Sequence, residues 1–193
     1  MSKDKLIHFF VASGLVSSQT AAEISTHFAA CVISKGEFLL REGKVCNEYF
    51  FLEEGFMRAF AHDTEGNDVT TNFYSGNQVV FEVSSFFTRS RSSENIQALT
   101  ESRGWIVSYE TLNMLFHTLP EFREFGRNIL VKGYAALKMR MLSTITETAE
   151  QRYEQLLRDN SEIFQHAPLK HIASYLGITD TSLSRIRKEF SRK

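Results

Sequence analysis

The sequence predicts an α+β fold in which a β-roll of jelly-roll type is flanked by helices. Two observations carry this prediction. Short β-rich runs, punctuated by glycine about every 8–12 residues, fill the stretch 31–109. Helical patterns precede that stretch and resume after it. With 193 residues, of which 42% are hydrophobic, the chain can bury a sizeable core.

Two short helices are expected first, over residues 3–12 and 17–28, and Ser17 is the expected N-cap of the second. The β-rich runs that follow are CVIS, EFLL, EYFFLEE, FMRAFAHD, DVTTNFY, NIQALTE and GWIVSY. In the run 68–74, strict alternation would place Val69, Thr71 and Phe73 on one face of the strand and the even-numbered residues on the other.

A long helix is expected to begin at Pro120 and to run to about Leu142. Its apolar residues form a stripe: Phe122, Phe125, Ile129, Leu130, Tyr134, Leu137 and Met141. The last four are spaced as in a coiled-coil seam, which predicts a homodimer joined through helix 120–142. The alternative is that the helix packs only on its own β-domain.

The segment 143–148 is rich in Thr and Ser and is expected to be a hinge. Thr148 and Gln151 have the spacing of a capping box for a helix that ends near Asp159. The sequence therefore predicts a domain boundary near 143–148.

Residues 168–190 have the pattern of a helix-turn-helix. Pro168 begins one helix, Gly177 ends it, and Thr179 caps a second helix whose Leu183 and Ile186 face inward. Polar side chains remain for its outer face: Asp180, Thr181, Ser182, Ser184, Arg185 and Lys188. Short polar groups and an arginine suit contact with base edges in a major groove. An αα-hairpin with a solvated basic face is the alternative.

The distribution of charge indicates that the same segment binds a nucleic acid. The chain as a whole has a net charge of −1, but residues 181–193 hold Arg185, Arg187, Lys188, Arg192 and Lys193 against one acidic residue, Glu189. Such local positive charge is what a phosphate backbone attracts. Double-stranded DNA is therefore the expected partner.

The order of these elements resembles the family of bacterial transcription regulators that includes the catabolite activator protein and the fumarate and nitrate reduction regulator. The strongest local matches are IASYLGITDTSLSRIRKE, GNQVVFEVSSFF and SSENIQAL. The resemblance implies a cyclic nucleotide-binding-like β-roll over 1–119, a dimerisation helix and hinge over 120–145, and a DNA-binding domain over 146–193. RNA polymerase is a further candidate partner.

Carried over by position, the residues expected to contact DNA are Thr179, Asp180, Thr181, Ser182, Ser184, Arg185 and Lys188. Asp180 departs from the cyclic-nucleotide-responsive members, which usually have Arg there. An acid repels phosphate and can accept from cytosine, so a different base sequence is expected. The β-hairpin wing that usually follows the recognition helix is expected to be absent or truncated.

Members that bind cyclic nucleotides have a phosphate cassette that begins with Gly-Glu and ends with Arg-Ser. Here Glu82 is kept, but Phe81 stands at the glycine position, and Ser92 and Ser93 stand at the Arg-Ser positions. An arginine is needed there to neutralise the cyclic phosphate.

Arg89 and Arg91 could replace the missing arginine, so the candidate ligand-binding residues are Glu82, Arg89, Arg91, Ser92 and Ser93. Solvated loop positions are the alternative for both arginines, and a helix N-cap or an ion pair is the alternative for Glu82. The pocket is expected not to respond to cyclic AMP in the usual way. The alternatives for the effector are a cyclic nucleotide, another small molecule or none.

Other classes of protein fit less well. Cys31 and Cys46 cannot supply an iron–sulfur cluster, and the six histidines are too scattered for a metal site. Only His62 lies in the strand region, which argues against a cupin-type metalloenzyme, so no catalysis is expected. A signal peptide and a membrane helix are not expected, which predicts a cytoplasmic protein. The alternative function is a ligand sensor that acts through protein contacts, with a vestigial helix-turn-helix.

Overall fold

The structure is a computed structural model that describes residues 2–190. Its helices are α1 (Asp4–Val11), α2 (Ser18–Thr26), α3 (Val83–Thr88), α4 (Tyr109–Thr118), α5 (Pro120–Thr146), α6 (Ala149–Asp159), α7 (Ile163–His166), α8 (Leu169–Leu176) and α9 (Asp180–Phe190). Its strands are β1 (Ala29–Ile33), β2 (Phe38–Leu40), β3 (Glu48–Glu54), β4 (Met57–His62), β5 (Asp68–Tyr74), β6 (Gln78–Val80), β7 (Asn95–Ala98) and β8 (Ser102–Ser108).

The eight strands form two antiparallel four-stranded sheets, in the orders β1-β8-β3-β6 and β2-β7-β4-β5. Their shared core is aromatic, and Phe50 and Phe51 of β3 are fully buried in it. The predicted jelly-roll-like β-roll is confirmed. At Gly104 of β8, a Cβ atom would lie 1.9 Å from the carbonyl oxygen of Phe51, so only glycine allows this approach of the two strands.

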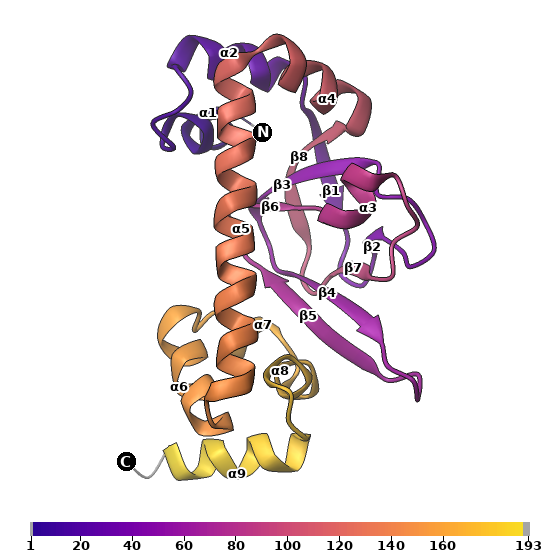
Figure 1. Ribbon diagram of the computed structural model, residues 1–193, viewed down its shortest axis with the longest axis vertical. Helices are drawn as coiled ribbons and strands as arrows, with labels where there is room; N and C mark the ends of the chain where they lie inside the picture. Colours follow the sequence, from indigo (N-terminus) through magenta and orange to yellow (C-terminus); the bar gives the residue numbers. More distant parts are fainter. Residues whose placement is uncertain (1, 191–193) are drawn as a thin grey trace.

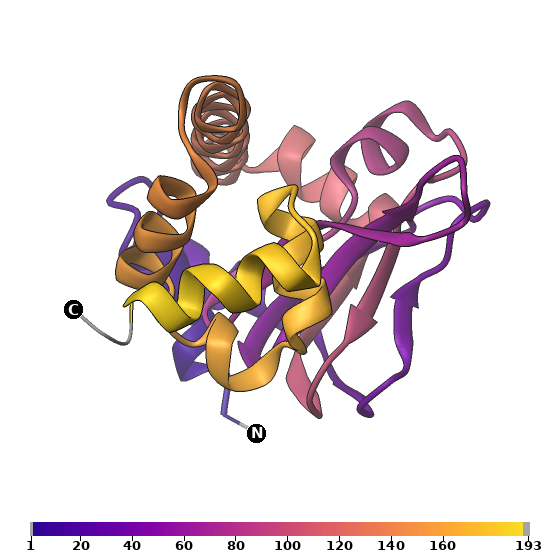
Figure 2. The same ribbon diagram turned by 90° about the horizontal axis from the view of Figure 1, so that it is seen from below.

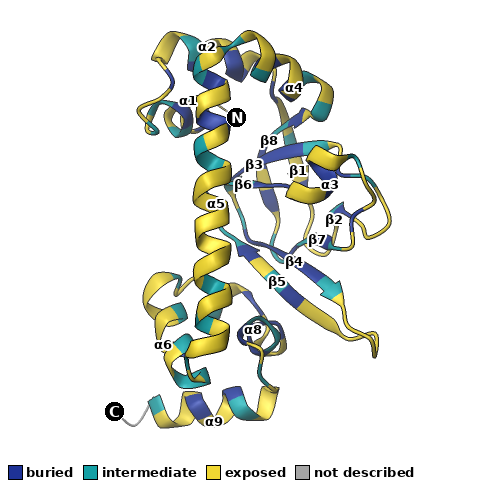
Figure 3. Ribbon diagram, in the orientation of Figure 1, coloured by how far each residue is buried: buried dark blue, intermediate teal, exposed yellow. Residues whose placement is uncertain are grey.

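Helix α5 runs along the whole molecule, from the β-roll at one end to α6, α8 and α9 at the other (Figure 1). Phe122 and Phe125 of its first turns pack on Phe10 of α1, with ring centroids 5.7 and 5.2 Å from that ring. Beyond these turns most of the helix is exposed (Figure 3). Pro120 occupies the first turn, as predicted.

Three differences from the sequence-based expectations concern the strands and the long helix. The short strand β6 was not predicted. Helix α5 continues to Thr146, so the expected hinge at 143–148 is reduced to the residues around Glu147. In β5 the pairing with β4 shifts between Ala59 and Phe60, which leaves Thr71 as an extra residue.

The expected alternation in β5 is therefore wrong. Thr70 and Phe73 both contact α8, through a hydrogen bond to Ser174 and through the ring of Tyr175.

A second hydrophobic cluster joins the C-terminal helices to the β-roll. It contains Phe56 and Phe73 of the roll together with Tyr153, Ile163, Ala167, Ile172, Ala173, Leu176, Leu183 and Ile186 of the helical part. Helix α8 packs directly against β5. The division at 1–119, 120–145 and 146–193 stays a proposal. Residues 191–193, where the wing was expected to be missing and where Arg192 and Lys193 stand, lie outside the described residues.

Candidate functional site

The C-terminal end forms the predicted pair of helices. Helix α8 ends at Gly177, whose φ of 68° is in the left-handed region that glycine adopts without strain. The hydroxyl of Thr179 accepts a hydrogen bond from the backbone N–H of Ser182 at 3.2 Å and caps α9. Leu183 and Ile186 are buried against Ile172, Ala173 and Leu176, as predicted.

The polar face of α9 points away from the rest of the molecule. Helix α9 crosses the end of the structure, with the β-roll and α5 behind it (Figure 2). The predicted contact residues Thr179, Asp180, Thr181, Ser184, Arg185 and Lys188 are all exposed. Ser182 is half-buried, because it takes part in the cap with Thr179. This face offers hydroxyls, one carboxylate and an arginine on a regular helix, which is the chemistry of base-edge readout.

Two arginines fix these helices to the rest of the chain. Arg152 of α6 donates to the carbonyl oxygens of Glu147 at 2.6 Å and of Leu176 at 2.9 Å, which ties the bend after α5 to the end of α8. Arg140 of α5 donates to the carbonyl oxygens of Thr71 and Tyr175, and its guanidinium lies 4.0 Å from the centre of the Tyr175 ring. Neither role was predicted from the sequence.

Glu82, the retained cassette residue, is the N-cap of α3. Its carboxylate accepts from the backbone N–H groups of Ser84 at 2.9 Å and Ser85 at 2.5 Å. The helix N-terminus that would attract an anion is therefore occupied by a carboxylate of the chain itself. Glu82 is therefore a helix N-cap, which is the alternative that the sequence gives for this residue.

The guanidinium of Arg89 is bound by the protein. It donates to the carbonyl oxygens of Cys46 at 2.9 Å and Phe86 at 3.3 Å, and to the side chain of Asn47. It also stacks 3.9 Å from the centre of the Tyr109 ring. Arg89 closes the loop around α3, and in this arrangement its donors are directed at protein acceptors.

The other three cassette candidates do not converge either. Arg91 and Ser93 are exposed. Ser92 is buried, and its hydroxyl donates to the carbonyl oxygen of Glu94 at 2.8 Å and accepts from the N–H of that residue at 3.0 Å. The structure therefore does not bring Glu82, Arg89, Arg91, Ser92 and Ser93 together around one cavity.

Aromatic rings fill the neighbouring interior. Phe81, at the cassette's glycine position, lies with its ring centroid 5.0 Å from that of Tyr49 and 5.3 Å from that of Phe86. Glu94 is half-buried nearby, and burial is the main cause that raises the pKa of its carboxyl, with a smaller contribution from the charge of Glu82. Two carboxylates lie in this region and protein acceptors bind the guanidinium of Arg89, which is unfavourable for a cyclic phosphate. Arg91, which is exposed, is the remaining cassette arginine.

Comparison with known proteins supports the fold. Residues 31–118 match the family model of the cyclic nucleotide-binding domain. The transcriptional activator protein Anr of Pseudomonas protegens is 23% identical over 171 residues, which cover 83% of this chain and 69% of Anr. Anr of Pseudomonas aeruginosa gives the same values.

Solved structures share the fold. FixK2 from Bradyrhizobium japonicum superposes with a TM-score of 0.74 at 15% identity, over 86% of this chain and 85% of FixK2. CLP from Xanthomonas campestris, a regulator responsive to cyclic di-GMP, gives a TM-score of 0.72 at 16% identity, over 91% and 92% of the two chains. A regulator of the CRP/FNR family from Eubacterium rectale gives a TM-score of 0.72 at 13% identity, over 95% and 88%.

The chain shares its fold with solved structures that include a transcription regulator of the CRP/FNR family.

The seam residues predicted on α5 are exposed. Leu130, Tyr134, Leu137 and Met141 are exposed, Tyr134 to 69% and Leu137 to 64%. A cleft of about 1120 Å³ lies between α5, the β5–β6 region and the C-terminal helices. An apolar stripe of this length beside a cleft is typical of a surface that another protein surface covers.

The described part of the chain holds no group of three or more histidine, cysteine or acidic side chains arranged to bind a metal ion. Among its helices from residue 2 to residue 190, none has the length and hydropathy needed to cross a membrane.

Proposed function

We propose that the protein is a homodimeric, sequence-specific DNA-binding transcription regulator, without catalysis, whose β-roll does not respond to cyclic AMP. The single observation that supports DNA binding best is the exposed polar face of α9, held on a helix-turn-helix with a capped start and a buried inner side. Arg185 and Thr181 are the proposed base-contacting residues, with Asp180 as the residue that alters the preferred sequence.

Dimerisation is proposed through α5. The exposed residues Leu130, Tyr134, Leu137 and Met141 repeat with spacings of 4, 3 and 4, so a second α5 can pack along the same line. Two copies of α9 would then be related by a two-fold axis, which fits a DNA site made of two half-sites.

The cassette supports the proposed lack of cyclic AMP control. Glu82 covers the N-terminus of α3, Arg89 is bound to backbone carbonyls, and Ser92 bonds within its own turn. A cyclic phosphate would have to displace these internal bonds, and the cassette arginine left to meet it is the exposed Arg91. The β-roll can still bind a different effector, because a fold does not by itself define its ligand.

The test is a selection of binding sites from random duplex DNA with the full chain, followed by titration of the selected duplex at several salt concentrations. A regulator loses affinity steeply as salt rises, and Arg185→Ala relaxes base preference at one position in each half-site. A matched control is Arg158→Ala, because Arg158 is exposed on α6 and pairs with Glu154 at 3.1 Å. Failure to enrich any sequence would instead favour a sensor that acts through protein contacts.

A further inference from the structure

The outer face of the sheet β2-β7-β4-β5 meets the helix-turn-helix at a polar contact. The backbone N–H of Thr70 on β5 donates to the hydroxyl oxygen of Ser174 on α8 at 3.1 Å, and the two hydroxyl oxygens lie 3.0 Å apart. Around this pair the rings of Phe73 and Tyr175 pack with centroids 5.2 Å apart. The α8–β5 contact consists of Thr70, Phe73, Ser174 and Tyr175 together with the buried Arg58 and His171 and the exposed Asp68.

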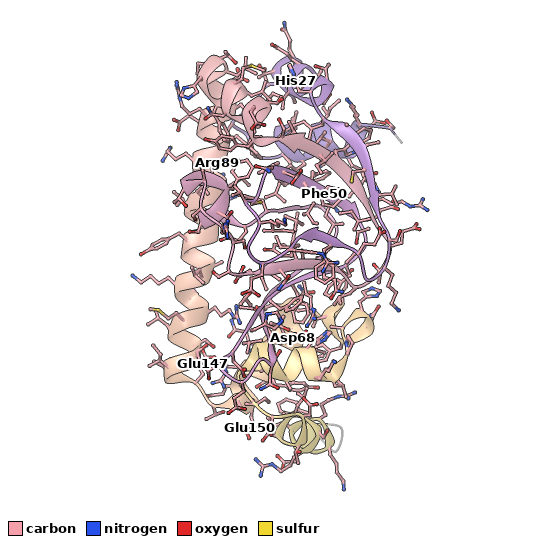
Figure 4. The ribbon with its side chains drawn as sticks, turned by 90° about the vertical axis from the view of Figure 1, so that its right-hand side faces the viewer. His27, Phe50, Asp68, Arg89, Glu147 and Glu150 are labelled. Carbon is pink, nitrogen blue, oxygen red and sulfur yellow. The ribbon has the colours of Figure 1, made fainter. Side chains whose placement is uncertain are left out.

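A buried arginine lies beside this contact. Arg58 of β4 is only 3% exposed, and its Nη2 lies 2.6 Å from the carboxylate of Asp68, whose place beside the C-terminal helices is visible in Figure 4. Its guanidinium also stacks 3.9 Å from the centre of the Phe60 ring. The Nε and Nη1 atoms of Arg58 and the Nδ1 atom of His171 have no hydrogen-bond partner among the described residues.

The contact therefore contains three buried nitrogen atoms without a hydrogen-bond partner among the described residues. The hydrogen bonds between Thr70 and Ser174 and the ring pair define one docked position. The bare nitrogens of Arg58 and His171 would regain water if α8 moved away, which lowers the net gain from docking. A contact with these properties can hold a domain in place and still open reversibly.

The docked position leaves the DNA-contacting face free. The contact uses α8, whereas Thr181 and Arg185 on the outer side of α9 are exposed while α8 is docked. Arg140 reinforces the same position, since it bonds α5 to both Thr71 and Tyr175. The free chain thus presents α9 to solvent without any bound effector.

We propose that the α8–β5 contact is a docking device that holds the helix-turn-helix in its DNA-competent position in the absence of an effector. This inference rests on the proposed DNA-binding function. A docked DNA-binding domain has already lost part of its rotational freedom. Less entropy is therefore lost when it binds DNA than when a loosely tethered domain binds. A chain that spends only a tenth of its time docked would bind about tenfold more weakly.

The test is a reversible cross-link in the full chain, made with Thr70→Cys together with Ser174→Cys. Their side-chain oxygens are 3.0 Å apart, so two sulfurs there are close to bonding distance. Oxidation forms the disulfide with loss of two electrons to an added oxidant such as diamide, and a thiol reductant reverses it. Cys46 is buried and half-buried Cys31 is on β1, so the Ser174→Cys single variant is the control for wrong pairing.

The expected result is a high yield of the intramolecular cross-link and a cross-linked protein that binds the selected duplex at least as tightly as its reduced form. Loss of binding on oxidation, restored by reduction, would overturn the proposal, because the docked state would then be inhibitory. Absence of the cross-link would overturn it too, because docking would not occur in solution. If the reduced protein binds no DNA while the cross-link forms, the proposed function fails and the docking itself stands.

A second variant works without oxidation. Ser174→Glu places a charge against β5 while leaving the inner residues Ile172 and Leu176 unchanged, so the helix-turn-helix keeps its own core. It should weaken binding of the selected duplex by about tenfold, as expected if docking is rarely populated. The control is Gln165→Glu, an exposed site on α7. Equal or tighter binding by Ser174→Glu would contradict the proposed role.

Discussion

Buried His171 makes the stability of the protein depend on pH. Burial is the main cause that lowers its pKa from 6.5 to about 4, and the positive charges of Arg58 and Lys170 lower it further. Asp68 and Asp180 act in the opposite direction but do not compensate. Between pH 6.5 and 4 the unfolded chain binds a proton on this imidazole and the folded chain does not, so stability is lost as the pH falls.

The size of the effect follows from the shift. Each pH unit below 6.5 costs about 1.4 kcal/mol until the folded-state pKa is reached, so at about pH 5 the free energy of unfolding should be lower by about 2 kcal/mol than at neutral pH. His171→Gln removes the titrating group and should remove this part of the pH dependence.

The assay is urea unfolding, followed by far-ultraviolet circular dichroism, at neutral pH and at about pH 5. Other groups titrate over this range, so the quantity that matters is the difference between the wild-type chain and His171→Gln. His27→Gln is the control, since His27 is exposed at the opposite end of the molecule (Figure 4). If His171→Gln lost as much stability at low pH as the wild-type chain does, the reasoning would be refuted.

Three further predictions test other parts of the structure. Leu137→Glu should weaken the proposed dimer at least about a hundredfold by sedimentation, whereas Lys138→Glu should leave it intact, and a dimeric Leu137→Glu would exclude this seam. Glu82→Ala removes the N-cap of α3 and should cost about 1 kcal/mol in urea unfolding; no loss would contradict the capping role. Gly177→Ala should cost about 1–2 kcal/mol through its φ alone, because its Cβ would meet nothing within 4 Å, and unchanged stability would show that the turn relaxes.

The helix-turn-helix could be predicted because its signals are local. The stop at Gly177, the cap at Thr179 and the inward Leu183 and Ile186 lie within ten residues of one another, and each works through neighbours in the chain. The same holds for the capping box of α6. Elements of this kind need little information from distant parts of the sequence.

The sequence predicts too early an end for α5, because threonine and serine are disfavoured in helix interiors. In the structure their hydroxyls bond one turn back, Thr144 to the carbonyl oxygen of Arg140 and Thr146 to that of Leu142, both at 2.9 Å. The helix therefore continues to Thr146, and these bonds are compatible with it. In a sequence the same residues are also typical of a hinge.

The contacts between distant segments could not be predicted. The shifted register of β5 depends on its pairing with β4, and the burial of Arg58 depends on α8 covering that sheet. Residues Met57–Phe60 are buried on both faces of the sheet. In a sequence, a strand without clear polar alternation is only a weak indication that another element covers the outer face. Two acceptors of Arg89 are backbone carbonyls, which no residue type in the sequence indicates.

The most direct test of the account is the affinity of the full chain for a selected duplex, measured by fluorescence anisotropy with and without cyclic AMP. We expect tight, salt-sensitive binding that cyclic AMP leaves unchanged, because Glu82, Arg89 and Ser92 make internal hydrogen bonds in the cassette and α9 is already exposed. Binding that appears only when cyclic AMP is added would contradict both the closed cassette and the effector-independent docking of α8 on β5.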